Sequence, residues 1–228
     1  MSYSEFNAQG FFVTSPLLSD IDLAQLSDHL AAITSNSATP KAGDRQLLSH
    51  AWCSQLAQVI GQHALLLDVL PSSYRAVQCS LFEKSIENNW LVALHQDLSI
   101  PVAEKVDHPA LNAWSNKDGC WFVQAPVEVL GQLVAVRLHV DVCTEFDGAL
   151  KLIPGSHQYG KLDTTHANTL RASSGERLCT VKRGAALVMR PLALHASSKA
   201  SGQSRRRVLH FVFGPQDLPY GLQWHYAV

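Results

Sequence analysis

Two His-x-Asp pairs in the chain carry side chains that a metal ion can use. His95 and Asp97 come at the end of an apolar segment, and His139 and Asp141 lie within another. Because residues i and i+2 of a strand project from one face, either pair can direct an imidazole and a carboxylate to one ion, although the second pair also fits the polar face of a strand. His195, in a late strand-like segment, offers a third ligand. Two histidines and one carboxylate that leave three positions open form a facial triad, which suits Fe(II).

The segments around these residues indicate a mainly β protein. Short apolar runs bounded by turns recur after Pro71, which is typical of an antiparallel sandwich or jelly roll. We expect strands at residues 75–82, 90–95, 132–142, 149–153, 178–181, 185–189 and 208–213. The strand at 132–142 has valine and leucine on one face and Arg137, His139 and Asp141 on the other. The polar face therefore meets either solvent or a wet cavity inside the roll.

The first part of the chain differs in character from the rest. Apolar residues with helical spacing predict helices over 20–33 and 52–60. A chain of this length can bury one sizeable core. We therefore expect a single domain over residues 1–228, in which 1–70 forms a helical outer layer and 71–214 forms the jelly-roll core.

The segment 98–126 has few strand signals and is too long for a plain turn. We expect a functional loop that closes over the substrate, with Trp114 and Trp121 as its hydrophobic cover.

Composition and charge exclude several classes of protein. The 228 residues include 18 Lys+Arg and 19 Asp+Glu, for a net charge of -1, which argues against a nucleic-acid partner. No apolar stretch approaches the roughly 18 residues of a membrane span, and the N-terminus lacks the basic residues of a signal peptide. Five scattered cysteines fit buried, reduced thiols. These features predict a cytoplasmic protein that acts on a small molecule, and they leave the oligomeric state open.

Four short motifs follow one another in the region from about residue 75 to residue 213. They are His95-Gln96-Asp97-Leu98, the segment Asp147 to His157 (DGALKLIPGSH), His195-Ala196-Ser197, and Arg206. In order and spacing they resemble the phytanoyl-CoA dioxygenase family of Fe(II)/2-oxoglutarate-dependent oxygenases. The resemblance implies the fold of that family, a double-stranded β-helix (jelly roll, cupin-like) with flanking N-terminal α-helices. It also favours the His95 pair over the second His-x-Asp pair.

The resemblance implies a role for five residues of these motifs. His95, Asp97 and His195 are implied as the ligands of Fe(II). Arg206 is implied as the partner of the distal carboxylate of 2-oxoglutarate, because a planar guanidinium can hold both oxygens of a carboxylate. Ser197 is similar to the hydroxyl that assists this arginine.

Two further residues, Gln96 and Arg137, are expected at the cofactor site. Arg137 stands where several family members have a tryptophan that lines the co-substrate pocket. A cation there indicates an anionic or polar group on the substrate, or an altered pose of 2-oxoglutarate; the alternative is an outward-facing arginine. Other candidates for the pocket lining are Gln78, Ser80, Lys84 and Trp114.

The resemblance implies an enzyme with Fe(II), 2-oxoglutarate and O2 as its cofactors, which hydroxylates a small molecule and releases succinate and CO2. Asp97 favours hydroxylation, because related halogenating enzymes have a small residue at that position. Two other functions remain open. One is a redox-neutral cupin-like isomerase or lyase with the same His/Asp/His metal site, which would not need Arg206. The other is a jelly-roll binding module without a metal.

Overall fold

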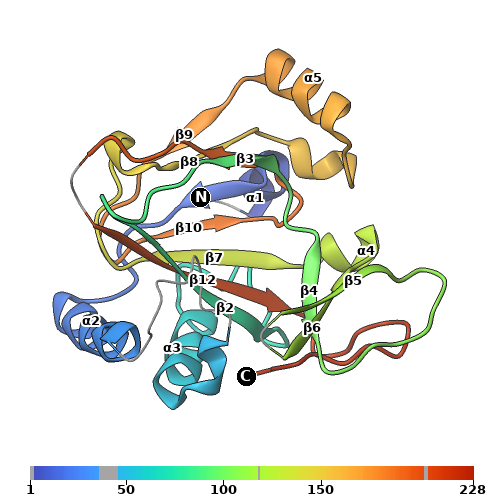
Figure 1. Cartoon of the computed structure of the whole chain (residues 1–228), viewed down its shortest axis with the longest axis horizontal. Helices are drawn as coiled ribbons and strands as arrows, with labels where there is room; N and C mark the ends of the chain where they lie inside the picture. Colours follow the sequence, from blue (N-terminus) through green and yellow to red (C-terminus); the bar gives the residue numbers. More distant parts are fainter. Residues whose placement is uncertain (1–2, 36–45, 118, 203–204) are drawn as a thin grey trace.

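Two antiparallel sheets face each other in the core of the protein (Figure 1). The computed structural model describes residues 3–35, 46–117, 119–202 and 205–228. The larger sheet has the strand order β1-β10-β7-β12-β2, and the smaller sheet has the order β3-β11-β8-β9. Their strands are β1 (Phe11–Val13), β2 (Arg75–Lys84), β3 (Val92–His95), β7 (Val134–His139), β8 (Leu150–Leu152), β9 (Arg177–Cys179), β10 (Ala186–Met189), β11 (His195–Ser197) and β12 (Arg206–Gly214). This architecture confirms the predicted mainly β jelly roll.

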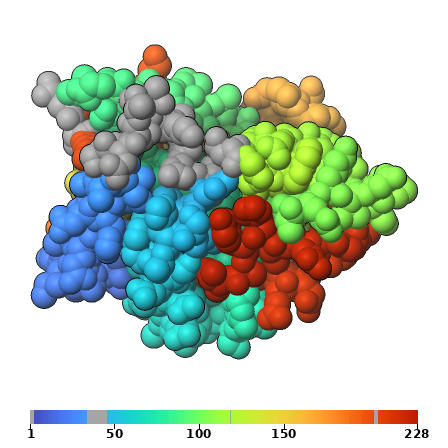
Figure 2. Space-filling view, turned by 60° about the horizontal axis from the view of Figure 1, so that its bottom comes forward, coloured from blue at the N-terminus to red at the C-terminus, as the bar shows by residue number. Residues whose placement is uncertain are grey.

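Two long helices cover the outer face of the larger sheet, on the side away from the smaller sheet (Figure 1). They are α2 (Asp20–Ser35) and α3 (Ala51–Gly61). Figure 2 shows both at the surface, in blue and cyan, with the C-terminal segment in red beside α3. Leu30 of α2 and Ile60 of α3 are buried in one hydrophobic cluster with Val136 of β7. The helices thus supply the apolar layer against which the larger sheet packs.

The first 70 residues are not entirely helical. β1 lies within them and pairs with the edge of the larger sheet, where Phe12 is the register partner of Val188. A strand of three residues is too short to show the alternation by which strands are predicted. The remaining helical elements are α1 (Tyr3–Gln9), η1 (Leu47–Ser49), α4 (Val127–Leu130), η2 (Glu145–Asp147), η3 (Ser156–Tyr159) and α5 (Thr164–Ser174).

Strand β7 shows how the roll makes its interior polar. Val134, Val136 and Leu138 point into the cluster beneath α2 and α3. Arg137 and His139, on the opposite face, are only 7% and 3% exposed, and Arg137 lines a pocket between the sheets. The polar face of this strand is therefore buried inside the roll, where Arg137 faces a cavity, and does not meet solvent.

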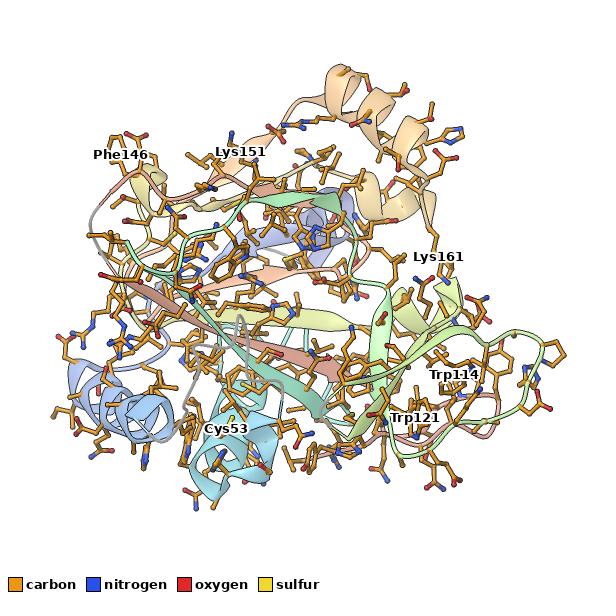
Figure 3. The ribbon with its side chains drawn as sticks, in the orientation of Figure 1. Cys53, Trp114, Trp121, Phe146, Lys151 and Lys161 are labelled. Atoms are coloured by element: carbon orange, nitrogen blue, oxygen red, sulfur yellow. The ribbon has the colours of Figure 1, made fainter. Side chains whose placement is uncertain are left out.

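The expectation of a loop over 98–126 is wrong, because this segment forms a third antiparallel sheet. Its order is β4-β6-β5, with β4 (Ser99–Val102), β5 (Asn112–Lys117) and β6 (Cys120–Gln124). Trp114 and Trp121 contact each other edge to face, with ring centroids 6.4 Å apart, and pack on a second hydrophobic cluster. Figure 3 shows the two indoles together on this sheet. Neither is among the residues that line the pocket, so neither covers it.

The structure also bears on the expectations for the cysteines and for membrane-spanning segments. The five cysteines all fall in the described part of the chain, where they are buried and form no disulfide with one another. Among the helices that the structure describes, none combines the length and the apolar character that crossing a bilayer requires.

Candidate active site

The three ligands expected for iron come together at the pairing of β3 with β11. His95 and His195 are direct register partners across these strands, and their ring centroids lie 4.1 Å apart. Asp97 follows β3 by two residues, and its backbone N–H donates to the carbonyl of Pro191 over 2.9 Å. The side-chain donor atoms of the three residues all lie within 4.8 Å of one another. In the described part of the chain, this is the only such group of at least three histidine, cysteine or acidic side chains.

The competing His-x-Asp pair has a structural role. The two carboxylate oxygens of Asp141 accept hydrogen bonds from Arg207, each over 2.8 Å. His139 is buried, and its Nδ1 has no hydrogen-bond partner. Of the two pairs, only His95 and Asp97 belong to a group of three possible metal ligands among the described residues.

Both histidine rings are held in the tautomer that a metal ligand needs. The Nδ1 of His95 lies 2.8 Å from the carbonyl of Ala93, and the Nδ1 of His195 lies 2.9 Å from the carbonyl of Ala193. A carbonyl oxygen only accepts, so each Nδ1 carries the proton and each Nε2 presents a lone pair. These Nε2 atoms lie 3.6 and 3.7 Å from the two carboxylate oxygens of Asp97. The donor set fits Fe(II), with two imidazoles and one carboxylate on one side of the ion.

The electrostatics of the site favour the metal-binding forms of His195 and Asp97. Burial lowers the pKa of His195 to about 4, so the ring is neutral near pH 7. Burial alone would raise the pKa of Asp97, but His195, His95 and His210 lower this pKa well below its usual value. For His95, burial lowers the pKa, while the hydrogen bond and charge of Asp97 outweigh that effect and raise it. Near pH 7, metal binding therefore competes with a proton at His95 and not at His195.

A pocket of about 440 Å³ opens in front of the three ligands, between the two sheets of the roll and β4–β6. Its lining includes one carboxylate, that of Asp97. It also includes four cationic side chains, Lys84, Lys117, Arg137 and Arg206. Three of these, Lys84, Arg137 and Arg206, are no more than 7% exposed. Buried cations without carboxylate partners are costly, so the pocket is built to receive an anion.

Arg206 and Lys84 form one cationic end of the pocket. They are register partners on β12 and β2, and both are at most 3% exposed. Arg206 donates from Nη1 to the carbonyl of Gly148 over 2.7 Å, while its Nε has no partner. Lys84 Nζ donates to Ser197 Oγ over 2.9 Å and to the carbonyl of Ser198 over 2.7 Å. The structure thus brings the predicted Arg206 and Ser197 to the same place and adds Lys84 to them.

Lys84 belongs to this end of the pocket, although the sequence predicted it only as a candidate for the pocket lining. Burial, followed by the charge of Arg206, lowers the pKa of Lys84 to about 8. Its aliphatic chain and ammonium pass close to Gly148, where an added Cβ would lie 3.0 Å from Nζ and 2.8 Å from the carbonyl oxygen of Ser198. Gly148 also has a positive φ of 66°. The glycine of the Asp-Gly pair thus leaves room for this lysine.

Arg137 occupies a second position in the pocket. Its Nη1 lies 2.9 Å from the Nδ1 of His210, and its guanidinium lies 5.3 Å from the ring centroid of Phe82. Burial lowers the pKa of His210 to about 3, so the neutral ring accepts from the arginine at Nδ1. The Nε2 of His210 then faces an oxygen of Asp97 at 3.9 Å. Arg137 therefore points into the pocket, and the alternative of an outward-facing arginine is wrong.

Gln96 lies at the edge of the pocket, but its amide group is used by the backbone. Its Nε2 donates to the carbonyls of Gly160 and Leu192, each over 2.7 Å, and its Oε1 accepts from the N–H of Leu162 over 2.8 Å. These bonds tie the loop between the two iron ligands of the first motif to two other loops. Gln96 therefore positions the ligands, and a direct contact with a cofactor stays a prediction.

Solved structures with the same fold support this reading of the architecture. They include the carbocyclase SnoK from nogalamycin biosynthesis, with a TM-score of 0.70, 12% identity, and coverage of 95% of this chain and 83% of SnoK. The epimerase SnoN in complex with Fe3+, alpha-ketoglutarate and nogalamycin RO has a TM-score of 0.69, 14% identity, and coverage of 96% and 89%. HygX from Streptomyces hygroscopicus, with nickel, 2-oxoglutarate and hygromycin B bound, has a TM-score of 0.63, 18% identity, and coverage of 94% and 88%. No curated protein matches the sequence significantly.

A jelly roll that holds two histidines and one carboxylate beside an open pocket is typical of non-haem Fe(II) oxygenases. Within that class, the chain belongs to the phytanoyl-CoA dioxygenase (PhyH) family, whose model matches residues 6–208. The family predicted from the four motifs is thereby confirmed. The protein is an enzyme of the Fe(II)/2-oxoglutarate oxygenase superfamily, with Fe(II), 2-oxoglutarate and O2 as its cofactors.

Proposed function

We propose that this enzyme hydroxylates a small-molecule metabolite and releases succinate and CO2. The observation that carries the proposal is Asp97, which completes the triad of iron ligands beside a pocket with a cationic end. With the carboxylate in place, the protein provides no extra position for a halide on the metal. A cytoplasmic location, expected from the sequence, stays a prediction.

His95, Asp97 and His195 would hold the iron, and the tautomers fixed by Ala93 and Ala193 keep both Nε2 atoms available to it. When bound, Fe(II) together with 2-oxoglutarate supplies the activation of O2 that oxidises a C–H bond. The protein contributes geometry, charge and the exclusion of water.

The distal carboxylate of 2-oxoglutarate would bind between Arg206, Lys84 and Ser197. Arg206 has an unpartnered Nε, and Lys84 is held toward the same place by Ser197. A carboxylate at this end would provide the counter-charge that both buried cations lack, through charge-assisted hydrogen bonds. The HygX and SnoN structures hold 2-oxoglutarate or alpha-ketoglutarate in the same fold, which supports a role for this co-substrate here.

The reaction outcome is the part that needs a direct test, because SnoK and SnoN are described as a carbocyclase and an epimerase. The Fe(II)-loaded enzyme is incubated with 2-oxoglutarate, ¹⁸O2 and a panel of small metabolites, and succinate and products are analysed by mass spectrometry. We expect succinate formation to depend on one class of metabolite, whose product gains one labelled oxygen atom. Product formation with unchanged mass and without consumption of 2-oxoglutarate would support a redox-neutral isomerase instead.

A further inference from the structure

The lining of the pocket has more positive charge than Fe(II) and 2-oxoglutarate together would neutralise. Four cationic side chains, Lys84, Lys117, Arg137 and Arg206, face one carboxylate. If Fe(II) and the 2-oxoglutarate dianion bind together, their charges cancel, and the excess of cations is unchanged. Lys117 is exposed, but the other three cations are at most 7% exposed. Unpaired buried charges are costly, so a further anion is needed to balance them.

We propose that the primary substrate is an organic anion whose acidic group is bound by Arg137. This inference rests on the proposed function, because it assigns 2-oxoglutarate to the end of the pocket formed by Arg206 and Lys84. The substrate class it names is an acid, such as a carboxylate or a phosphate monoester, with a small apolar body.

Strand register places Arg137 and Arg206 at two different levels of the roll, that is, at two different positions along β12. Arg137 pairs with His210 on β12, and His210 pairs with Ser80 on β2. Arg206 lies four residues before His210 on the same strand, which is about 13 Å along a strand. The pocket therefore has two cationic levels, and Arg137 shares its level with the histidine that faces Asp97.

The guanidinium of Arg137 is oriented but not neutralised. Neutral His210 holds Nη1, and the face of Phe82 supports the planar group from one side. The Nε of Arg137 has no partner, and no carboxylate of the described residues forms an ion pair with this arginine. An arginine fixed in this way is preorganised for a planar or tetrahedral anion, because its donors need not be ordered when the ligand binds.

The region of the pocket beside Arg137, on the side away from Arg206, is suited to the apolar body of such an acid. Apolar side chains line it from β4–β6, from β12 and from the turn before β7, namely Ile100, Phe122, Val212 and Leu133. Gln78, the register partner of Val212, adds one polar group. Lys117 lies 5.2 Å from the ring centroid of Phe122 and extends the positive potential toward β5. A short hydrocarbon body beside Arg137 would thus meet an apolar wall.

The test measures binding and does not need turnover. Protein loaded with Ni(II) and saturating 2-oxoglutarate is titrated with straight-chain carboxylates from butyrate to octanoate, with their primary amides, and with butyl phosphate, by ligand-observed saturation-transfer NMR. We expect at least one acid to bind roughly tenfold more tightly than its amide, as a charge-assisted hydrogen bond provides. Arg137→Gln should remove this preference, and Arg137→Lys should retain part of it.

Two controls separate the possible failures. Arg205→Gln removes an arginine that pairs with Glu83 outside the pocket, so it should leave the preference for acids unchanged. The affinity for 2-oxoglutarate is measured in parallel for each variant by calorimetry, and it should change by less than about twofold in Arg137→Gln, because the distal carboxylate of the co-substrate binds at the other level. Thermal unfolding checks that Arg137→Gln is folded, and Arg137→Lys provides the second variant.

Three results would overturn parts of this account in distinguishable ways. If the wild type binds acids and amides equally, Arg137 does not select an anionic substrate. If Arg137→Gln loses affinity for 2-oxoglutarate by the same factor as for the acids, Arg137 belongs to the co-substrate site. If the wild type does not bind 2-oxoglutarate, the proposed function fails before the substrate is considered.

Discussion

His95 and His195 are direct register partners in the antiparallel pairing of β3 with β11. Two residues that are far apart in the sequence are thus placed with their rings 4.1 Å apart by backbone pairing alone. Their Nε2 atoms are directed at opposite oxygens of one carboxylate, that of Asp97. The metal site is therefore built on a sheet, which is a more rigid support than a loop, and only Asp97 depends on the turn that follows β3.

Removing the carboxylate ligand should remove iron binding. We expect Asp97→Ala to weaken Fe(II) binding by more than about 100-fold, since even loss of an outer-shell partner of a metal ligand costs 10–100-fold in affinity. Anaerobic equilibrium dialysis with metal analysis measures the effect. Asp107→Ala, at an exposed position, is the matched control and should bind iron as the wild type does. Normal iron binding by Asp97→Ala would contradict the ligand assignment.

The hydroxyl of Ser156 should stabilise the strand that carries His195. Ser156 Oγ donates to the carbonyl of Ile153 over 2.7 Å and accepts from the N–H of Leu194 over 2.8 Å. Ser156→Ala leaves that buried N–H unpaired and should lower the free energy of unfolding by about 1–3 kcal/mol, measured by urea unfolding. Ser173→Ala, on the exposed side of α5, should change it by less than about 0.5 kcal/mol. Equal stabilities of the two variants would argue against this role for the Pro-Gly-Ser-His turn.

Binding of 2-oxoglutarate should weaken in alkaline solution because of Lys84. Burial and the charge of Arg206 lower the pKa of this lysine to about 8 in the free enzyme. Above that pH the ammonium loses its proton, so the dissociation constant should rise by up to about tenfold per pH unit. Lys84→Met should bind more weakly at pH 7 and show little change between pH 7 and 9, as measured by calorimetry.

The exposed Lys105→Met is the control for that experiment and should follow the wild-type pH profile. A wild-type affinity that is constant up to pH 9 would show that Lys84 does not contact the co-substrate.

The metal-free protein should lose stability in mild acid because of buried histidines. Burial, followed by the charges of Arg137 and Arg206, holds the pKa of His139 well below its ordinary value of 6.5. Below about pH 6.5 the unfolded chain takes up a proton that folded His139 does not, so the free energy of unfolding falls as the pH falls. His195 and His210, with pKa values lowered to about 4 and about 3, act in the same direction.

His139→Gln should reduce the slope of this fall by about 1.4 kcal/mol per pH unit between pH 6 and pH 5. Urea unfolding of the metal-free protein at several pH values measures the slope. Ser173→Ala, at an exposed position of α5, does not titrate and should keep the wild-type slope. If His139→Gln keeps it as well, then His139 is protonated in the folded protein.

The sequence contained the residues of the iron site but did not distinguish between its two His-x-Asp pairs. Both pairs have the spacing of one strand face, and the resemblance to a family was needed to favour one. The structure shows the physical difference: Asp141 is occupied by Arg207, whereas Asp97 has only histidines as partners. That difference depends on which strand lies beside β7, which local spacing does not specify.

Lys84 and the third sheet were harder to predict for the same reason. A lysine in a strand is usually exposed, and the burial of Lys84 follows from its pairing with Arg206, more than 100 residues later in the chain. In the segment expected as a loop, Pro101 and a polar β5 weakened the strand signal. Pro101 is tolerated because β4 is at the end of its sheet, and the pairing with β6 decides the conformation.

The most direct test of the central claim is an anaerobic titration of metal-free enzyme with Fe(II) and then 2-oxoglutarate, followed by visible absorption. Chelation of the co-substrate to iron gives a metal-to-ligand charge-transfer band. We predict this band in the wild type and in Arg205→Ala, a weaker band at equal 2-oxoglutarate concentration in Arg206→Ala, and no band in Asp97→Ala. A wild type that binds iron without developing the band would contradict the account, because the pocket would then hold a metal but not 2-oxoglutarate.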